Sequence, residues 1–479
     1  MTKPDPILVA LVAGALGTVS REMAESMLRT SRSPIFSEVR DFVTAIFDRH
    51  GRLVAQTAFI PVLMGSTPFA LRAIAGRFGA GLQDGDVFLL NDPFHGNNHL
   101  PDFTVARPVF VEGEPAFWVM TRGHQADAGA KGSSGYNPEA RNVWEEGIRI
   151  PPVRLYEGGA RRDDTWEFLL LNLRLPEIVE GDLMCQVGAC VVGERRLRAL
   201  GGKYGMETLD AAIAAYLSGT EAQMRREIRK IPNGIYHAER FMDNDGVARD
   251  RLVAVRLALT VEDEEIRFDY SASDPQVAGY VNSPLSNTTS CSYIALFSSL
   301  EEDVPVTAGS IAPVRVVSRE GTVTNARPPA ATTGCTLITC AALVEAGWMA
   351  LAQAVPGQAQ GLWGRWCGPM KTAYNPRTGR WTVSLSNQCK PGAGATEGHD
   401  GWGHIGPISS SGGRARPIPS CTSWSTRTPS SATSSGRTAA GRADGAAGSA
   451  STRAGASRRR RRSAPRRVAA CAPKRSPPG

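Results

Sequence analysis

The sequence predicts a large subunit of the mixed α/β (α+β) class, built in several layers, whose β-hairpins carry a candidate site. Segments with helical periodicity alternate with short segments rich in β-branched and aromatic residues. With 42% hydrophobic and 21% charged residues, the 479-residue chain has the composition of a globular protein with two or three domains. We expect an N-terminal α/β region at 1–235, a mixed β-rich region at 236–407 and a disordered basic tail at 408–479.

Each element is predicted from its local pattern. Asp5 and Pro6 are typical of a helix start, and the apolar segment behind them continues as an amphipathic helix. Alternating residues predict a first hairpin, and Gly201 with Gly202 is expected to separate two long helices. The remaining expected segments are strands at 41–47, 52–55, 87–90, 251–260, 265–270 and within 361–381, and helices at 67–78, 182–200, 206–231 and 342–354.

A second hairpin carries the most informative pattern in the chain. Residues 103–110 and 116–120 read as its strands, with a turn at 112–114. Two His-x-x-Asp elements flank it, His99/Asp102 and His124/Asp127. If the hairpin folds about Gly113, Asp102 lies opposite His124 and His99 lies opposite Asp127, and opposed Cβ atoms are roughly 5 Å apart.

Two imidazoles and two carboxylates at one end of a ribbon form a ligand set suited to a divalent ion such as Mn, Zn or Fe. The metal ligands predicted on this basis are His99, Asp102, His124 and Asp127. The alternative is an ordinary loop at 91–98, in which each histidine is only a hydrogen-bonded partner of an aspartate.

Two further segments border the candidate site. Glu145 or Glu146 could act as a general base or an added carboxylate ligand, or either could be a solvated glutamate. The glycine-rich segment 128–135 lacks phosphate-loop spacing, so a mobile lid is favoured over an anion site. Because no nucleophile elbow, Walker motif or dinucleotide fingerprint occurs, the chain offers no recognisable ATP or NAD site.

Charge and hydropathy restrict the partners. The net charge of +8 comes from the tail, where residues 408–479 carry fifteen basic residues and one acid. The rest of the chain is mildly acidic, which argues against nucleic-acid binding. No apolar stretch is expected to cross a membrane, so we predict a soluble protein of the cytoplasm. The nine scattered cysteines are expected to be reduced and buried.

The tail changes composition abruptly at about residue 409 to Ser, Arg, Ala, Thr, Gly and Pro, with no leucine. Such a segment buries too little apolar surface to fold. One interpretation is a disordered basic tail that binds nucleic acid or an acidic surface through residues 458–462. The favoured interpretation is a frameshift, because a shifted reading frame across 419–443 can encode a strand-like sequence punctuated by turns.

The motifs resemble those of the hydantoinase B/oxoprolinase family, which includes N-methylhydantoinase B subunits and is related to the α-subunits of acetone and acetophenone carboxylases. The segments that carry the resemblance are 37–42 (SEVRDF), 85–86 (GD), 91–102 (NDPFHGNNHLPD), 122–127 (RGHQAD), 145–152 (EEGIRIPP), 181–182 (GD) and 203–205 (KYG). Their order is specific, and they span most of residues 5–407. The sequence departs from the family pattern at 61–65 (PVLMG) and at Gln125, where the family carries histidines.

The resemblance implies one subunit of an ATP-dependent hydrolase that opens cyclic amides such as hydantoin or 5-oxoproline. A hydantoinase A-like partner would bind ATP and phosphorylate the amide, in a hetero-oligomer. Beside the metal ligands, Asp92 and Glu145 or Glu146 are the candidate base or second-layer residues, and Asp41 and Arg122 could orient the substrate. The alternatives are an ATP-dependent ketone carboxylase subunit and a truncated copy without catalytic function.

Overall fold

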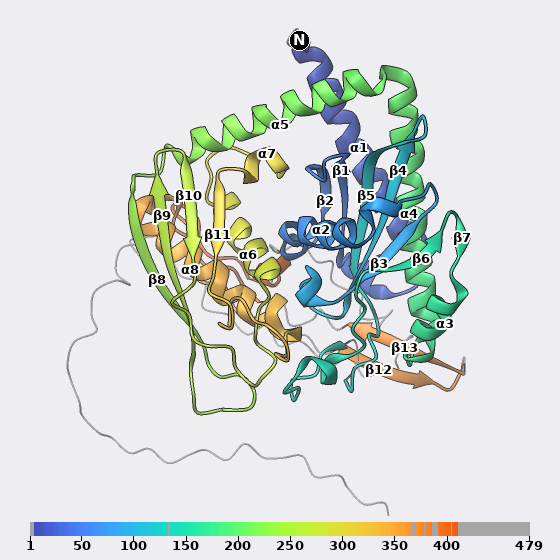
Figure 1. Cartoon of the computed structure of the whole chain (residues 1–479). Helices are drawn as coiled ribbons and strands as arrows, with labels where there is room; N and C mark the ends of the chain where they lie inside the picture. The colour runs from blue at the N-terminus through green and yellow to red at the C-terminus, as the bar shows by residue number, and fades with distance from the viewer. Residues whose placement is uncertain are drawn as a thin grey trace, which may run out of the picture.

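The computed structural model describes residues 4–132, 135–365, 370–377, 379–385, 391–403 and 405–410. Its elements form two layered bodies that lie side by side (Figure 1). The helices are α1 (Pro6–Thr30), α2 (Thr67–Phe78), α3 (Asp163–Leu171), α4 (Pro176–Tyr204), α5 (Met206–Ile228), α6 (Leu285–Phe297), α7 (Ala308–Ile311) and α8 (Ile338–Ala354). The mixed α+β class predicted from the sequence is confirmed. All but the first three residues of the predicted tail lie outside the described residues.

The first body is built on a seven-stranded antiparallel sheet in the order β2-β1-β5-β4-β3-β6-β7. Its strands are β1 (Phe42–Asp48), β2 (Leu53–Ala58), β3 (Val87–Leu90), β4 (Asp102–Val111), β5 (Glu114–His124), β6 (Val153–Glu157) and β7 (Ala160–Arg161). Helices α1 and α4 cover one face, and α2 packs on the other. Alternation along β4 and β5 therefore separates two apolar cores.

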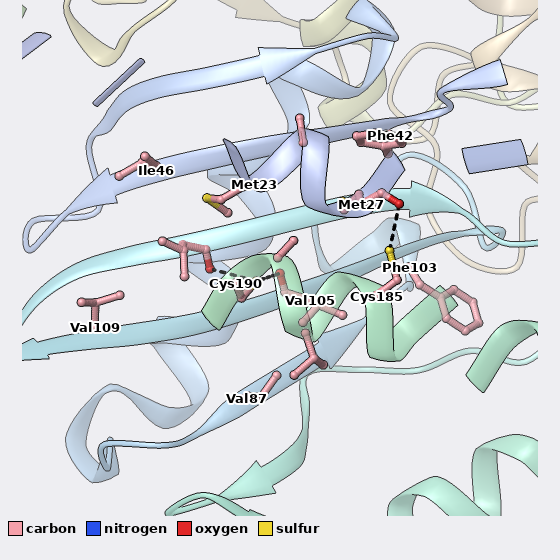
Figure 2. Close-up of a cluster of buried hydrophobic side chains, with 14 of the residues drawn as sticks. Met23, Met27, Phe42, Ile46, Val87, Phe103, Val105, Val109, Cys185 and Cys190 are labelled. Carbon is pink, nitrogen blue, oxygen red and sulfur yellow. Dashed lines mark hydrogen bonds between the residues drawn. The ribbon is translucent and has the colours of Figure 1, made fainter. Parts of the chain in front are cut away.

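Figure 2 shows the larger core, where α1 and α4 lie on the sheet. Met23 and Met27 of α1 meet Cys185 and Cys190 of α4 above Phe103 and its neighbours on the strands. The Cys185 thiol donates to the carbonyl of Met27 at 3.3 Å. Each such large apolar side chain stabilises the fold by about 1.5–3 kcal/mol when fully buried, so α1 is held firmly against the sheet.

The β4–β5 hairpin has the register that the sequence predicted at its open end. Asp102 pairs with His124, and the pairing continues without a shift as far as Val109. Glu112 (φ 52°) and Gly113 (φ 86°) form the turn with two positive φ angles, which only a two-residue hairpin of the primed type requires. A bulge between Val109 and Phe110 absorbs the odd residue beside the turn.

Helix α4 does not end at Gly201-Gly202, contrary to expectation. Gly201 is buried against Val111, with too little space for a larger residue, so it serves close packing inside the helix. The chain breaks instead at Gly205, whose φ of 75° starts the change of direction into α5. Helix α5 then runs from the first body to the second (Figure 1).

The second body is a four-stranded sheet in the order β11-β10-β9-β8, packed against α6 and α8. Its strands are β8 (Gly234–Met242), β9 (Val253–Glu262), β10 (Glu265–Asp269) and β11 (Val314–Val317), and a separate pair is formed by β12 (Met370–Asn375) and β13 (Arg380–Leu385). Helix α6 was not expected, because its sequence LSNTTSCSYIALF is rich in residues that favour caps and turns. It is buried along almost its whole length between the two bodies.

Helix α1 corrects one expectation about hydropathy. By length and composition alone, its 25 residues could cross a membrane. In the structure, Val12, Leu16, Val19 and other residues of one face pack into the core of the first body. The five described cysteines, at 185, 190, 291, 335 and 340, are free and buried, as expected.

Candidate metal centre

The candidate site lies where β4 begins and β5 ends. Asp102 opens β4, and its cross-strand partner His124 closes β5. The backbone N–H of His124 donates to the carbonyl of Asp41 at 3.0 Å, which ties this end of β5 to the start of β1. His99 is on the loop just before β4, and its carbonyl accepts the backbone N–H of Asp102 at 3.2 Å.

Three buried asparagines hold the loop that carries His99. Asn97 Nδ2 donates to the carbonyls of Asn91 and His99, at 2.9 and 3.2 Å, and to that of Asp102. Asn91 Nδ2 donates to the carbonyls of Leu100 and Ile148 at 2.8 and 2.9 Å. Asn98 binds the carbonyl of Val62. These amides satisfy carbonyls that would otherwise be buried without partners, so the loop has one fixed path.

His99, Asp102 and His124 converge on a common point. His99 Nε2 lies 3.0 Å from Asp102 Oδ1, His124 Nδ1 lies 3.4 Å from the same oxygen, and the two ring nitrogens are 3.3 Å apart. Ligand atoms bound at roughly 2.1 Å to one ion, with angles of about 90 to 110°, are about 3.0 to 3.4 Å apart. The spacing of the three atoms therefore fits a single divalent ion.

The polar contacts within this triad are incomplete without a cation. Both oxygens of Asp102 are buried and accept no well-aligned hydrogen bond from the described residues. His99 Nδ1 lies 2.9 Å from the carbonyl oxygen of Thr333, which can only accept, so Nδ1 carries the proton. In the neutral ring the lone pair of Nε2 then faces Asp102. A carboxylate and this lone pair repel each other unless a proton or a metal ion lies between them.

The pKa shifts of His99 and Asp102 also indicate that the site favours a positive charge. Burial lowers the pKa of His99, but the charge of Asp102, the hydrogen bonds to Asp102 and Thr333 and the charge of Asp41 together outweigh it, so the pKa is raised. Burial alone raises the pKa of Asp102, but the facing imidazoles of His99 and His124 hold it well below its ordinary value. The site thus attracts positive charge at the point where the three side chains meet.

Glu146 stands behind His99. Its Oε2 accepts the backbone N–H of Thr332 at 2.7 Å, and its Oε1 accepts the backbone N–H of Thr333 at 2.7 Å as well as the Thr333 hydroxyl. Burial raises the pKa of Glu146 to about 7, against these hydrogen bonds, which lower it. Glu146 therefore fixes Thr333, the residue whose carbonyl orients His99.

Three of the other predicted site residues make structural contacts. Asp127 Oδ1 accepts the N–H of Gly129 at 2.9 Å, and its Oδ2 accepts those of Arg174 and Leu175, so it is not in the triad. The chain leaves the strand after His124, which removes the predicted pairing of Asp127 with His99. Asp92 caps Phe94 and binds the guanidinium of Arg149. Glu145 binds Asn142 and the N–H of Arg141 at the surface.

Asp41 and Arg122 lie nearer to the triad. The half-buried Asp41 carboxylate contributes to the raised pKa of His99. The guanidinium of Arg122 is fully buried and donates to the hydroxyls of Thr104 and Ser66. Burial lowers the pKa of Arg122 to about 10, opposed by the charge of Asp102. Arg122 therefore supplies positive charge beneath the triad, with its donors occupied by protein atoms.

Two residues that contact the triad, Thr333 and Tyr136, were not predicted from the sequence. Thr333 is 234 residues from His99 in the chain, and a backbone carbonyl leaves no sequence signal. Tyr136 stacks on the imidazole of His124, with centroids 5.4 Å apart and rings at 18°, and meets His99 edge-on at 5.7 Å. A lone aromatic residue directly behind the glycine-rich segment 128–135 was the available signal for Tyr136.

Known proteins are similar to this chain in sequence and in fold. The family model described as hydantoinase B/oxoprolinase matches residues 5–465. The chain is 34% identical over 412 residues to the β-subunit of the caprolactamase of Pseudomonas jessenii, covering 85% of this chain and 70% of the relative. It is 31% identical over 375 residues to the B component of a putative D-/L-hydantoinase of Pseudomonas sp. (strain NS671), covering 75% of this chain and 63% of that relative.

Two solved structures share the fold. The crystal structure of the ATP-dependent caprolactamase from Pseudomonas jessenii superposes with a TM-score of 0.82 at 33% identity, over 88% of this chain and 73% of that one. A nucleotide-free acetone carboxylase superposes with a TM-score of 0.77 at 19% identity, over 85% of this chain and 56% of that one. The likeness to the carboxylase is one of fold alone.

Proposed function

Because the chain belongs to the hydantoinase B/oxoprolinase family, we propose that it is a subunit of an ATP-dependent hydrolase that opens cyclic amides. The substrate would be a lactam, a hydantoin or a 5-oxoproline-type ring. Two relatives carry the names of a caprolactamase and a hydantoinase subunit, which supports both the amide substrate and a multi-subunit enzyme. We propose the cytoplasm as its location.

The partner in this proposal is a hydantoinase A-like subunit that binds ATP and phosphorylates the amide. The chain itself carries no recognisable nucleotide-binding motif, so ATP binding is assigned to the partner. The caprolactamase is described as ATP-dependent, and the component of it that this chain resembles is named a β-subunit. These names support a second subunit without identifying it.

The observation that carries the proposal is the convergence of His99, Asp102 and His124. These residues would hold one divalent ion, Mn, Zn or Fe, by their nitrogen and oxygen atoms. When bound, such an ion polarises a carbonyl oxygen or lowers the pKa of an attacking water. Glu146 holds Thr333, whose carbonyl keeps His99 in one tautomer. Asp41 is the predicted carboxylate left to orient the substrate or accept a proton.

Reconstitution with the partner subunit tests this function. The wild-type complex should open a lactam or hydantoin ring with ATP consumption, and His99→Ala and His124→Ala should lose at least about 100-fold of that activity. His237→Ala is the matched control, because this histidine is exposed on β8 in the second body. Activity of both site variants at the wild-type level would favour a non-catalytic role instead.

The same complex tests the carboxylase alternative that the shared fold raises. A ketone and labelled bicarbonate are supplied in place of the cyclic amide. Incorporation of label without any ring opening would replace the hydrolase proposal with that of a ketone carboxylase. Ring opening without incorporation would retain it.

A further inference from the structure

A cleft of about 860 Å³ lies on the far side of Tyr136 from the metal triad. Residues 131, 132 and 136–139 border it on one side. The end of β8 and the segment that follows, 240–249, border it on another. Tyr280 and the start of α8 complete the wall. The cleft therefore lies between the two bodies of the chain, as the triad does.

The triad itself is closed to solvent. His99, Asp102 and His124 are exposed by 1%, 0% and 2%. Tyr136 is only partly buried, contacts both imidazoles and lines the cleft. Its hydroxyl is 3.5 Å from that of Thr336, at the limit of a hydrogen bond. The ring thus stands between the cleft and the metal position, where it packs against both histidines.

The walls of the cleft indicate the class of ligand. Phe241, Tyr280, Leu337 and Ile338 offer apolar surface for the carbon atoms of a small ring. Lys131 pairs with Glu139, and both Arg240 and Arg365 bind the buried Glu345. Two guanidinium groups share this one carboxylate, and Asp243 on the same wall offsets the remaining positive charge through its attraction to Arg365.

The excess positive charge of the cleft comes from Arg249. It is exposed at the same wall and forms no ion pair among the residues that the structure describes. An anionic group on the ring would find its counter-charge here.

We propose that this cleft is the entrance and first binding site for the activated substrate, a small ring bearing an anionic group. In this proposal the side chain of Tyr136 is a gate between the cleft and the triad. The inference rests on the proposed function for the identity of the ring. Rotation of the Tyr136 side chain would open a direct path from the cleft to His99 and His124. The aromatic ring, and not the hydroxyl, provides the closure.

Access is tested on the metal-free chain by modifying histidines with diethyl pyrocarbonate and mapping the products by mass spectrometry. His99 and His124 should be protected in the wild type and in Tyr136→Phe, and modified at least tenfold faster in Tyr136→Ala. His237 gives the rate of an exposed histidine in the same sample. Circular dichroism and thermal unfolding show whether Tyr136→Ala is folded. Unchanged protection of the two histidines in the folded variant would overturn the proposal that Tyr136 is a gate.

The ligand class is tested by calorimetric titration with phenyl phosphate, a ring that carries an anion. Arg249→Glu should weaken binding at least tenfold, whereas Arg319→Glu, an arginine that does not line the cleft, should leave it unchanged. Equal affinity in the two variants, or no saturable binding to the wild type, would overturn the assignment. Neither experiment needs ring opening, so failure of the proposed function and failure of this inference are separate results.

Discussion

His99 Nδ1 lies 2.9 Å from the carbonyl oxygen of Thr333, a residue that belongs to the second body of the chain. This contact sets the tautomer of the imidazole, so that its other nitrogen is available to a metal ion. Glu146 in turn accepts the N–H of Thr333, so His99 and Glu146 of the first body both bind this one residue of the second. The site is therefore complete only when the two bodies are packed together.

Replacing Glu146 should weaken metal binding although the residue does not touch the metal position. We expect Glu146→Gln to lower the affinity for the divalent ion by about 10- to 100-fold, as for other residues that orient a ligand. Competition with a chromophoric chelator measures the affinity. Glu145→Gln is the matched control, since the side chain of this neighbour binds Arg141 and Asn142 of its own surface loop. An equal loss in both variants would contradict a specific role for Glu146.

Asp102 and Asp127 should respond differently to the same substitution. Asp102→Asn should reduce metal binding to background, because it removes the one carboxylate of the triad. Asp127→Asn should retain the metal. It should lower the free energy of unfolding by about 1–3 kcal/mol, because acceptors for buried N–H groups are lost. Metal analysis and urea unfolding of both variants test these two expectations. Loss of the metal in Asp127→Asn would show that Asp127 is a metal ligand after all.

The titration of Glu146 should make stability depend on pH. Its pKa in the folded chain is about 7, raised by burial from 4.5. The folded state therefore binds more protons than the unfolded state between these values, and stability falls as the pH rises through that window. The contribution of protonated Glu146 to the stability of the fold is fully present below pH 4.5.

Urea unfolding of the metal-free chain measures this dependence. As the pH rises through the window, the wild type should lose at most about 3 kcal/mol of unfolding free energy relative to Glu146→Gln. A difference that stays constant with pH would show that Glu146 remains ionised throughout.

Asn97 should prove more important than its distance from the chemistry suggests. Asn97→Ala removes donors from the carbonyls of Asn91, His99 and Asp102. Each buried acceptor left unsatisfied costs about 1–3 kcal/mol, so the loop should loosen and both stability and metal affinity should fall. Thermal unfolding and metal titration give the two readouts. Wild-type affinity in this variant would mean that the loop is held by other contacts.

The sequence predicted the pairing of Asp102 with His124 because this part of the site depends on local geometry. A hairpin with a turn at Gly113 requires Asp102 and His124 to face each other, and the structure has this pairing. The same arithmetic did not apply to Asp127, because pairing ends at His124 and the chain turns away to bind residues before α4. A register argument holds only as far as the strands extend.

Contacts between distant segments could not be derived in this way. Thr333 acts through a carbonyl, and Tyr136 is defined by what it covers, so neither is distinguished by residue type. Helix α6 was missed because its polar residues are buried against the first body, where tertiary packing outweighs their local preference. Gly205, and not the Gly201-Gly202 pair, ends α4, since only the former adopts a positive φ.

The central claim is that His99, Asp102 and His124 bind one divalent ion. Anomalous X-ray diffraction from crystals soaked in manganese tests it most directly. We predict a single strong peak within bonding distance of His99 Nε2, Asp102 Oδ1 and His124 Nδ1, and no such peak in crystals of Asp102→Asn. A well-ordered triad without a peak, or a peak that persists in the variant, would contradict it.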